Sequence, residues 1–432
     1  MTETRNEPVE VPASADAPGR FERMKVEVVS GGTQRDTDPE APEPMTMFLG
    51  IAAWIGLFVV LALVSPWTLV FVVGLVLSVI LHEFGHFWTA RRSGMKATQF
   101  FVGFGPRVWS FHHNGVEYGL RALPLGGFVK IIGMTNMDEV AEEDEAVTYR
   151  QASYPKRMWV ITAGSVMHMI LAVGLITSVY AVWGQVRESG RVTIREVVAD
   201  SPAQAAGFEG GDIVLSVDGT AVADRDAFTT ILAAAQPGST HEFVVQRDGS
   251  ELSLSATLVQ HPDVTDKVQG FLGVRSSSEE RLPTGNVVDA FKDGTQDLFV
   301  GMGQAVVGVS KVINPVNVWG HLVGTNDDIT SRPGTVVGAA KLSDDVGKYD
   351  GWAGMLGFLA LVNLSIGVFN MFPLLPLDGG HAAIATYERL RSRKGRRYYA
   401  DVAKLMPVAA ICIMLLAFMF LTGLYLDTAG GG

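Results

Sequence analysis

Five apolar runs, each long enough to cross a lipid bilayer, constrain this sequence more than any other feature. The bilayer core is about 30 Å thick, so a helix needs about 20 apolar residues to span it. Inside lipid, every backbone polar group has to be satisfied within the segment, which favours helices. The sequence therefore predicts a polytopic α-helical membrane protein of about five spans, formed by the runs Met47 to Val64, Trp67 to Ala90, Met158 to Trp183, Gly351 to Leu375 and Lys404 to Tyr425.

The composition narrows the function. The chain has 432 residues, of which 48% are hydrophobic and 18% charged, as expected for membrane helices joined to a soluble insert. Its net charge of -11 argues against nucleic-acid binding. With Cys412 as the one cysteine, an internal disulfide and a zinc site with two thiolates are both excluded. Any metal must therefore be held by histidine and carboxylate groups.

The second run contains the sequence H-E-F-G-H, His82 to His86. Residues four apart lie on one face of a helix, so His82 and His86 can bind one zinc ion, and Glu83 can act as general base for a water activated by it. Ionisable side chains within a span cost roughly 2.5 to 3.5 kcal/mol each and are rarely kept without a function. The alternative, two histidines bonded to neighbouring helices, leaves Glu83 unexplained. We therefore predict a zinc site within the membrane.

A third ligand is expected where the fourth run ends, in N-M-F-P-L-L-P-L-D-G-G-H, residues 370–381. Pro373 and Pro376 cannot continue a regular helix, and broken backbone at membrane depth is tolerated where it lines a cavity or is buried in protein. The break in the helix places the carboxylate of Asp378 where it can serve as the third ligand. Two histidines and one carboxylate leave a fourth tetrahedral position for water, as in catalytic zinc sites. The predicted reaction is peptide hydrolysis within or at the edge of the bilayer.

Basic residues set the predicted orientation of the spans. Residues 91–96, residues 156–157 and the stretch R-L-R-S-R-K-G-R-R (389–397) flank the second, third and fourth spans. The positive-inside rule assigns all three to the cytoplasm, and five spans satisfy this. The N-terminus is then cytoplasmic, and the insert between the third and fourth spans lies outside.

The run Leu298 to Val316 is also apolar, but Gln304, Ser310 and Lys311 favour a helix on the membrane surface or packed under the insert. A sixth span here would place residues 389–397 outside the cell. It would also put Asp378 in the opposite leaflet from the two histidines.

Two regions between the spans are expected to contain strands. Alternating residues such as V-E-Y-G-L-R-A-L predict strands within residues 93–156. A turn at Gly126 and Gly127, followed by F-V-K-I-I, could offer a strand edge to an extended peptide, or could belong to an ordinary surface hairpin. Residues 190 to about 262 predict a small β-rich domain with two short helices and a hairpin turn at Asp248 and Gly249.

Taken together, H-E-F-G-H, P-L-G-G-F-V-K and N-M-F-P-L-L-P-L-D-G-G resemble the site-2 protease family of intramembrane zinc metalloproteases, particularly its bacterial regulator-of-sigma-E-type branch. The resemblance extends from about Trp67 to Tyr425. It implies one zinc per chain and regulated intramembrane proteolysis of single-span membrane proteins such as anti-sigma factors, after a first cut outside the membrane. The residues implied in these roles are His82, His86 and Asp378 as zinc ligands, Glu83 as catalytic base, Asn370 on the substrate backbone, and Gly126, Gly127, Phe128 and Val129 in the β-loop that holds the substrate as a strand.

The resemblance also implies a PDZ-like insert that filters substrates by size or binds a peptide, and a bacterial inner or plasma membrane location. The predicted divisions are a disordered acidic cytoplasmic tail (1–44), a helical hairpin with H-E-F-G-H (45–92), a cytoplasmic β-loop region (93–156), the third span (157–184), a PDZ-like extracytoplasmic domain (190–275), an extracytoplasmic or membrane-surface helical segment (276–350), the fourth span with N-M-F-P-L-L-P-L-D-G-G (351–388), a basic cytoplasmic loop (389–400) and the last span (401–426).

One departure from the family pattern falls in the third span. Bacterial members carry G-P-x-x-N there, whereas this chain has Gly164, Ser165 and then His168 in place of the asparagine. His168 could reach the metal region, although a lone membrane histidine more often bonds to a neighbouring helix. Two other functions are open: an inactive scaffold that binds partners through its insert, which leaves Glu83 without a purpose, and a transporter, which lacks an evident inverted repeat.

Overall fold

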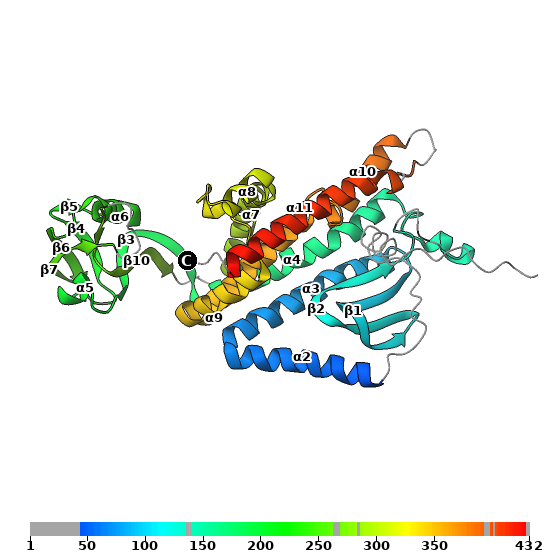
Figure 1. Cartoon of the computed structure of the whole chain (residues 1–432), viewed down its shortest axis with the longest axis horizontal. Helices are drawn as coiled ribbons and strands as arrows, with labels where there is room; N and C mark the ends of the chain where they lie inside the picture. Colours follow the sequence, from blue (N-terminus) through cyan, green and yellow to red (C-terminus); the bar gives the residue numbers. More distant parts are fainter. Residues whose placement is uncertain are drawn as a thin grey trace, which may run out of the picture. The chain divides into compact units, whose positions relative to one another are not determined.

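The computed structural model describes residues 44–134, 138, 140–261, 268–282, 286–392, 398–400 and 402–428. The predicted acidic tail and residues 393–397 of the basic loop lie outside these residues, apart from Pro44. The chain divides into two compact units (Figure 1). The helical unit comprises residues 1–177 and 291–432, and the β-rich unit comprises residues 178–290.

The helical unit is built on five helices that are long and apolar enough to cross a membrane, counted over the described residues. All five predicted runs are therefore confirmed as helices, except that residues 371–375 of the fourth run lie beyond the end of its helix. The fourth helix begins earlier than its apolar run, and its backbone leaves helical geometry at Gly351, with φ of 59°, where the run was predicted to start. The five helices are α2 (Pro44–Val64), α3 (Pro66–Arg92), α4 (Tyr154–Trp183), α9 (Val336–Asn370) and α11 (Val402–Thr428).

Helices α2 and α3 form the predicted tight hairpin. Ser65 is the N-cap of α3, its hydroxyl accepting from the Thr68 N–H, and Pro66 occupies the first turn, where its missing N–H is not needed. The Ser65 hydroxyl also donates to Asp344 on α9. Phe71 of α3 is fully buried against Met355 and neighbouring residues of α9. This packing fixes α3, the helix with the two predicted zinc-binding histidines, against α9.

The apolar run that was predicted to lie on the membrane surface forms a bent helix pair. Helix α7 (Val287–Ile313) and helix α8 (Pro315–Leu322) meet at 65°, and together they pass the same length and apolarity criteria as the five spans, as a broken span or a re-entrant loop. Leu298 of α7 packs with Ala172 of α4 and Leu364 of α9. Helix α7 therefore covers the α4–α9 pair.

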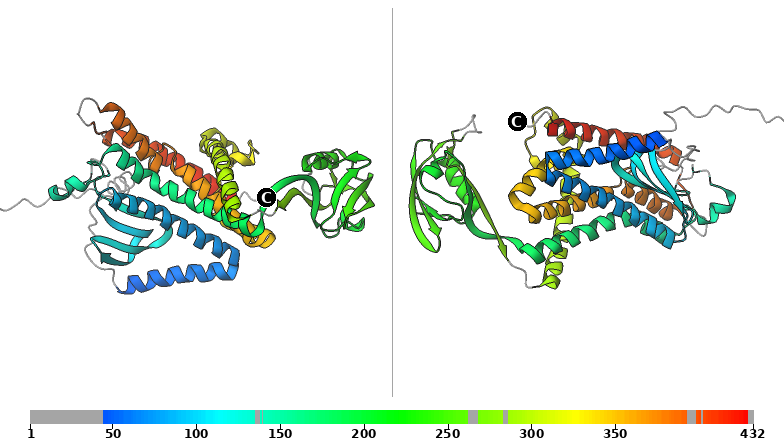
Figure 2. Two further views of the ribbon diagram at one scale, coloured as in Figure 1. Left: turned by 180° about the vertical axis from the view of Figure 1, so that it is seen from behind. Right: turned by 90° about the horizontal axis from the view of Figure 1, so that it is seen from below.

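Strands β1 (Ala97–His113) and β2 (Val116–Ile131) form a long antiparallel hairpin that lies against α3 (Figures 1 and 2). The turn between them is at Asn114 and Gly115, both with positive φ, as in a two-residue hairpin loop. The predicted turn at Gly126 and Gly127 is not the turn of a separate hairpin, because both glycines lie inside β2. The chain nevertheless reverses direction just before Gly127: residues 117–120 run parallel to residues 99–102 of β1, and residues 127–130 run antiparallel to them. Gly126 adopts φ of 96°, so glycine bends the strand here without ending it.

The β-rich unit has one main sheet of strand order β10-β3-β4-β6-β7, with β5 beside β4. The predicted hairpin turn at Asp248 and Gly249 is confirmed between β6 and β7, and both predicted helices are present. Phe228 and Phe243 are fully buried in its core. The elements are β3 (Gln185–Val197), α5 (Pro202–Ala205), β4 (Ile213–Val217), β5 (Thr220–Ala221), α6 (Arg225–Ala234), β6 (Thr240–Arg247), β7 (Ser250–Thr257), β8 (Val259–Gln260), β9 (Gly270–Phe271) and β10 (Val274–Leu282).

Candidate metal centre and active site

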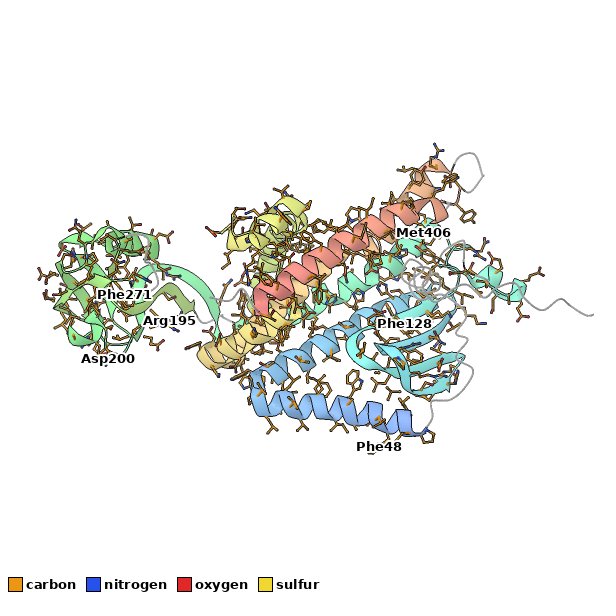
Figure 3. All side chains as sticks on the ribbon, in the orientation of Figure 1. Phe48, Phe128, Arg195, Asp200, Phe271 and Met406 are labelled. Atoms are coloured by element: carbon orange, nitrogen blue, oxygen red, sulfur yellow. The ribbon has the colours of Figure 1, made fainter. Side chains whose placement is uncertain are left out.

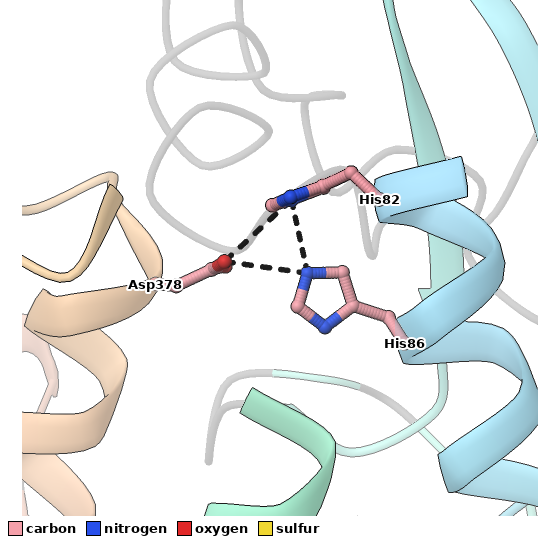
Figure 4. A group of neighbouring side chains, drawn as sticks. All are labelled: His82, His86 and Asp378. Atoms are coloured by element: carbon pink, nitrogen blue, oxygen red, sulfur yellow. Dashed lines mark hydrogen bonds and ion pairs between the residues drawn. The ribbon is translucent and has the colours of Figure 1, made fainter. Parts of the chain in front are cut away.

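The two histidines of H-E-F-G-H project from one face of α3, one turn apart. Their Nε2 atoms are 3.1 Å apart, and His82 is 8% exposed (Figure 4). The Nδ1 atom of His86 lies 2.8 Å from the carbonyl oxygen of Val160 on α4. An N–H donated to this carbonyl places the proton on Nδ1 and leaves the lone pair of Nε2 facing His82, as in histidines that bind metals.

Asp378 approaches the histidines from a different helix, α10 (Asp378–Arg391). Its Oδ2 atom lies 3.5 Å from Nε2 of His82 and 3.3 Å from Nε2 of His86 (Figure 4). The two glycines that follow make this position accessible. A Cβ on Gly379 would lie 2.2 Å from the carbonyl oxygen of Phe372, and one on Gly380 would lie 2.9 Å from the backbone of Leu374. The chain between α9 and α10 therefore folds directly onto the start of α10.

The three facing atoms fit a zinc ion. Their separations of 3.1 to 3.5 Å match the edge of a tetrahedron with zinc–ligand bonds of 2.0 to 2.1 Å, which is about 3.3 Å. Oδ2 of Asp378 is buried and has no hydrogen-bond partner. Converging lone pairs repel one another unless a cation lies among them. Within the described residues, these three side chains form the one group of this kind whose ligand atoms all lie within 4.8 Å of one another.

Gly164 on α4 gives the imidazoles their space. A Cβ at this position would lie 2.4 Å from Cε1 of His82 and 2.4 Å from Nε2 of His86. On the other helix, a Cβ on Gly85 would lie 2.8 Å from the carbonyl oxygen of Ala163. Two glycines therefore bring α3 and α4 into close contact at the metal centre, and any larger residue at position 164 would push into the ligand atoms.

Glu83 lies between the histidines in sequence and beside strand β2 in space. Its Cγ atom would be 3.1 Å from a Cβ on Gly127, and its carboxylate accepts a hydrogen bond from the backbone of Val129. The neighbouring Phe128, labelled in Figure 3, stacks on Phe101 of β1, and their ring centroids are 5.5 Å apart. The structure therefore brings the predicted base and the predicted substrate-holding residues Gly127 to Val129 together. Gly126 precedes them in the same strand.

His168 is bonded to a neighbouring helix and does not join the metal-ligand group. Its ring centroid is 5.0 Å from that of His82, and its Nδ1 atom lies 2.8 Å from Oδ1 of Asn363 on α9. The amide nitrogen of Asn363 donates to the carbonyl of Leu359. Oδ1 is therefore an acceptor, and Nδ1 of His168 carries the proton. Sequence reasoning missed Asn363, although an asparagine within an apolar run is itself a signal of a buried polar contact.

Asn370 is the last residue of α9 and is half-buried. It precedes the irregular segment that leads to Asp378, and it is not part of the three-residue metal-ligand group. Its predicted contact with the substrate backbone stays a prediction.

Comparison with known proteins agrees with this centre. Residues 70–416 match Peptidase family M50, and the chain belongs to this family, the site-2 protease type of zinc metalloprotease. Five apolar helices are consistent with a multi-pass membrane protein.

Three relatives illustrate the match. Zinc metalloprotease Rip1 of Mycobacterium tuberculosis is 31% identical over 388 residues, which cover 82% of this chain and 95% of the relative. Zinc metalloprotease Rip1 of Mycolicibacterium smegmatis is 32% identical over 389 residues, with the same coverage. Metalloprotease MmpA of Caulobacter vibrioides is 29% identical, covering 76% of this chain and 87% of the relative. Zinc metalloprotease relatives imply zinc as the metal here.

Among solved structures, the PDZ domain of the SdrC-like protein of Listeria monocytogenes was found at 20% identity. It covers 21% of this chain and 92% of that chain, with a TM-score of 0.18.

Proposed function

We propose that this chain is an intramembrane endopeptidase that holds one zinc ion through His82, His86 and Asp378. Its substrates are transmembrane segments of single-span regulatory proteins, such as anti-sigma factors, that have already been cut outside the membrane. The observation that carries the proposal is the meeting of three ligand atoms within 3.5 Å of one another, with Glu83 on the same turn of α3.

The chemistry divides between the cation and the side chains. A bound zinc would supply the Lewis acidity that amide hydrolysis needs. Glu83 takes a proton from the attacking water and gives it to the departing amine, which is general base and then general acid catalysis. Its carboxylate is held by the backbone of Val129. The Val160 carbonyl holds the imidazole of His86 in one tautomer.

A substrate helix has to unwind before it can be cut, because its carbonyls are engaged in backbone hydrogen bonds. Residues 99–102 of β1 lie between residues 117–120 and residues 127–130 of β2. Residues 127–130 therefore form a border of the folded hairpin, next to Glu83. An extended substrate segment can add to this border as a further strand, with its backbone beside the base.

The proposed orientation follows from charge. Basic residues at the end of α3, in the first turn of α4 and at the end of α10 favour the cytoplasm for these ends. The N-terminus is then cytoplasmic, and the β-rich unit lies on the outer side of a bacterial plasma or inner membrane. There it would act as a PDZ-like filter or bind a peptide, while the apolar helices contact lipid.

The test is zinc content and cleavage measured on the same purified full-length protein. The wild type should bind about one zinc and cut a single-span test protein. Glu83→Ala should retain the zinc and lose cleavage by at least about 1000-fold, since it removes the base and no ligand. A zinc-free wild type would refute the proposal. Full rescue of a deletion strain by Glu83→Ala would favour the scaffold function.

A further inference from the structure

A cavity of about 360 Å³ lies in the helical unit between α4, α7, α9 and the segment after α9. Its size is at the lower end of the range of small-ligand pockets. Most of its wall is apolar. Val166 and Met169 come from α4, Met302 and Val306 from α7, Val368 from α9 and Phe372 from the segment after α9.

The cavity borders the residues that support the metal centre at three points. Ser165, in its wall, follows Gly164, which contacts both imidazoles. Gly367 packs against His168, whose ring lies beside that of His82. The wall residue Met371 contacts Gly379, the residue after Asp378, through its backbone. The cavity is therefore adjacent to the supports of all the predicted ligands.

One wall residue has a polar group without a partner. Ser165 is 5% exposed, and its hydroxyl makes no hydrogen bond within the described residues. Thr162, one turn earlier, donates its hydroxyl to the carbonyl of Met158 in the ordinary way for a helix. A buried hydroxyl left unpaired destabilises the folded chain unless a ligand satisfies it.

We propose that this cavity is a specificity pocket that takes one apolar side chain of the substrate, from a residue next to the scissile bond. This inference rests on the proposed function. In an extended chain, successive side chains point to opposite sides, so a substrate paired with β2 directs a side chain away from the sheet. The apolar wall selects an aliphatic or aromatic side chain, and Ser165 offers one hydrogen bond to the backbone that carries it.

Helix α7 contributes to the size of the pocket, because Met302 and Val306 form its part of the wall. Val306 and Val307 are adjacent, with side chains 48% and 58% exposed, yet only Val306 lines the cavity. This pair offers a matched comparison. Val306→Trp fills the pocket, whereas Val307→Trp places the same bulk on the same helix outside it.

The experiment measures kcat/KM of the full-length protein in detergent. The probes are single-span test proteins that differ at one residue beside the wild-type cut, which carries Ala, Leu, Phe or Trp. The wild type should prefer Leu or Phe to Ala. Val306→Trp should lower the Phe-to-Ala ratio by at least about 10-fold, because a hydrophobic pocket discriminates on this scale. Val307→Trp should leave the ratio within about twofold of wild type.

Val306→Ala provides the opposite change and guards against a variant that fails to fold. It should raise cleavage of the Trp probe relative to the Leu probe, with the zinc content of the wild type. Equal ratios in wild type, Val306→Trp and Val306→Ala would overturn the pocket while leaving the protease function intact. A wild type that cuts none of the probes would overturn both.

Discussion

In the helical unit, Oδ2 of Asp378 and Oγ of Ser165 are buried without a hydrogen-bond partner. In the β-rich unit, by contrast, both carboxylate oxygens of the fully buried Asp212 are bonded to Arg247, at 2.7 and 2.8 Å, and one also accepts from the Glu209 N–H. Burying a polar group without partners is unfavourable, so such groups persist where a ligand or a reaction uses them. At the metal centre and the cavity beside it, Asp378 and Ser165 each keep an unpaired oxygen, whereas the buried carboxylate of the β-rich unit is fully satisfied by protein groups.

The largest expected effect comes from removing the metal, which should abolish activity at the helical unit and leave the β-rich unit unchanged. Treatment of the full-length wild type with a strong zinc chelator should abolish cleavage, because the three ligand atoms lose their cation. Hydrogen exchange of the β4 and β6 amides should not change, since Asp212 is satisfied by protein groups alone. Added zinc should restore cleavage. Exchange in β4 that rises on chelation would break the distinction between the units.

A single methyl group placed among the ligands is expected to have the next largest effect. Gly164→Ala puts a Cβ 2.4 Å from both imidazoles, so the ligands must move. A displacement of about 1 Å at a catalytic centre can cost about 100-fold in rate, and cleavage should fall by at least that factor. Gly174→Ala, on the same helix with nothing within 4 Å of its Cβ, serves as the control. Equal activity of the two variants would contradict this view of the site.

Replacement of Asp212 in the β-rich unit is expected to lower the stability of that unit without affecting catalysis. Burial opposes ionisation of Asp212, but hydrogen bonds from Arg247 and from the Glu209 N–H outweigh it and hold its pKa below the usual value. A carboxyl group with a lowered pKa stabilises the folded state above its unfolded pKa of about 3.9, and this contribution is lost as the pH falls through the folded value. Asp212→Asn should therefore destabilise this unit by about 1 to 3 kcal/mol at pH 7.

The same variant predicts a pH dependence. Hydrogen exchange in β4 and β6 of the full chain should report the loss at neutral pH, and the gap between wild type and Asp212→Asn should narrow below pH 4. Zinc content should be unchanged. A gap that widens on acidification would show that the sign of the pKa shift is wrong.

The smallest expected effect comes from an exposed ion pair in the same unit. Glu196 and Arg275 lie 3.5 Å apart, and both side chains are more than half exposed. Solvent screening makes such pairs worth about 0 to 1 kcal/mol. Glu196→Gln should change the stability of the β-rich unit by less than about 0.5 kcal/mol in the same exchange measurement. A loss as large as that of Asp212→Asn would show that burial does not decide the value of these charges.

The spans and the ligand set could be predicted because their signals are local. An apolar run specifies a membrane helix, and the spacing of His82 and His86 fixes their shared face. The β-loop was less predictable. Gly126 and Gly127 look like a turn between two strands, but β2 continues through them and folds back on itself there, with positive φ at Gly126. The true turn at Asn114 and Gly115 carried the stronger hairpin signal.

Contacts between helices could not be read from one sequence. The bond between His168 and Asn363 joins residues 195 positions apart. The space that Gly164 leaves for the imidazoles depends on how closely α4 approaches α3. Both follow from packing, which periodicity within a single helix does not report.

The origin of the third ligand has a mechanical consequence. Asp378 begins α10, whereas the histidines belong to α3. A cation bound by all three therefore cross-links two helices that are distant in sequence. The free energy of cation binding and the free energy of the contact between α3 and α10 are then linked. Loosening either one weakens the other.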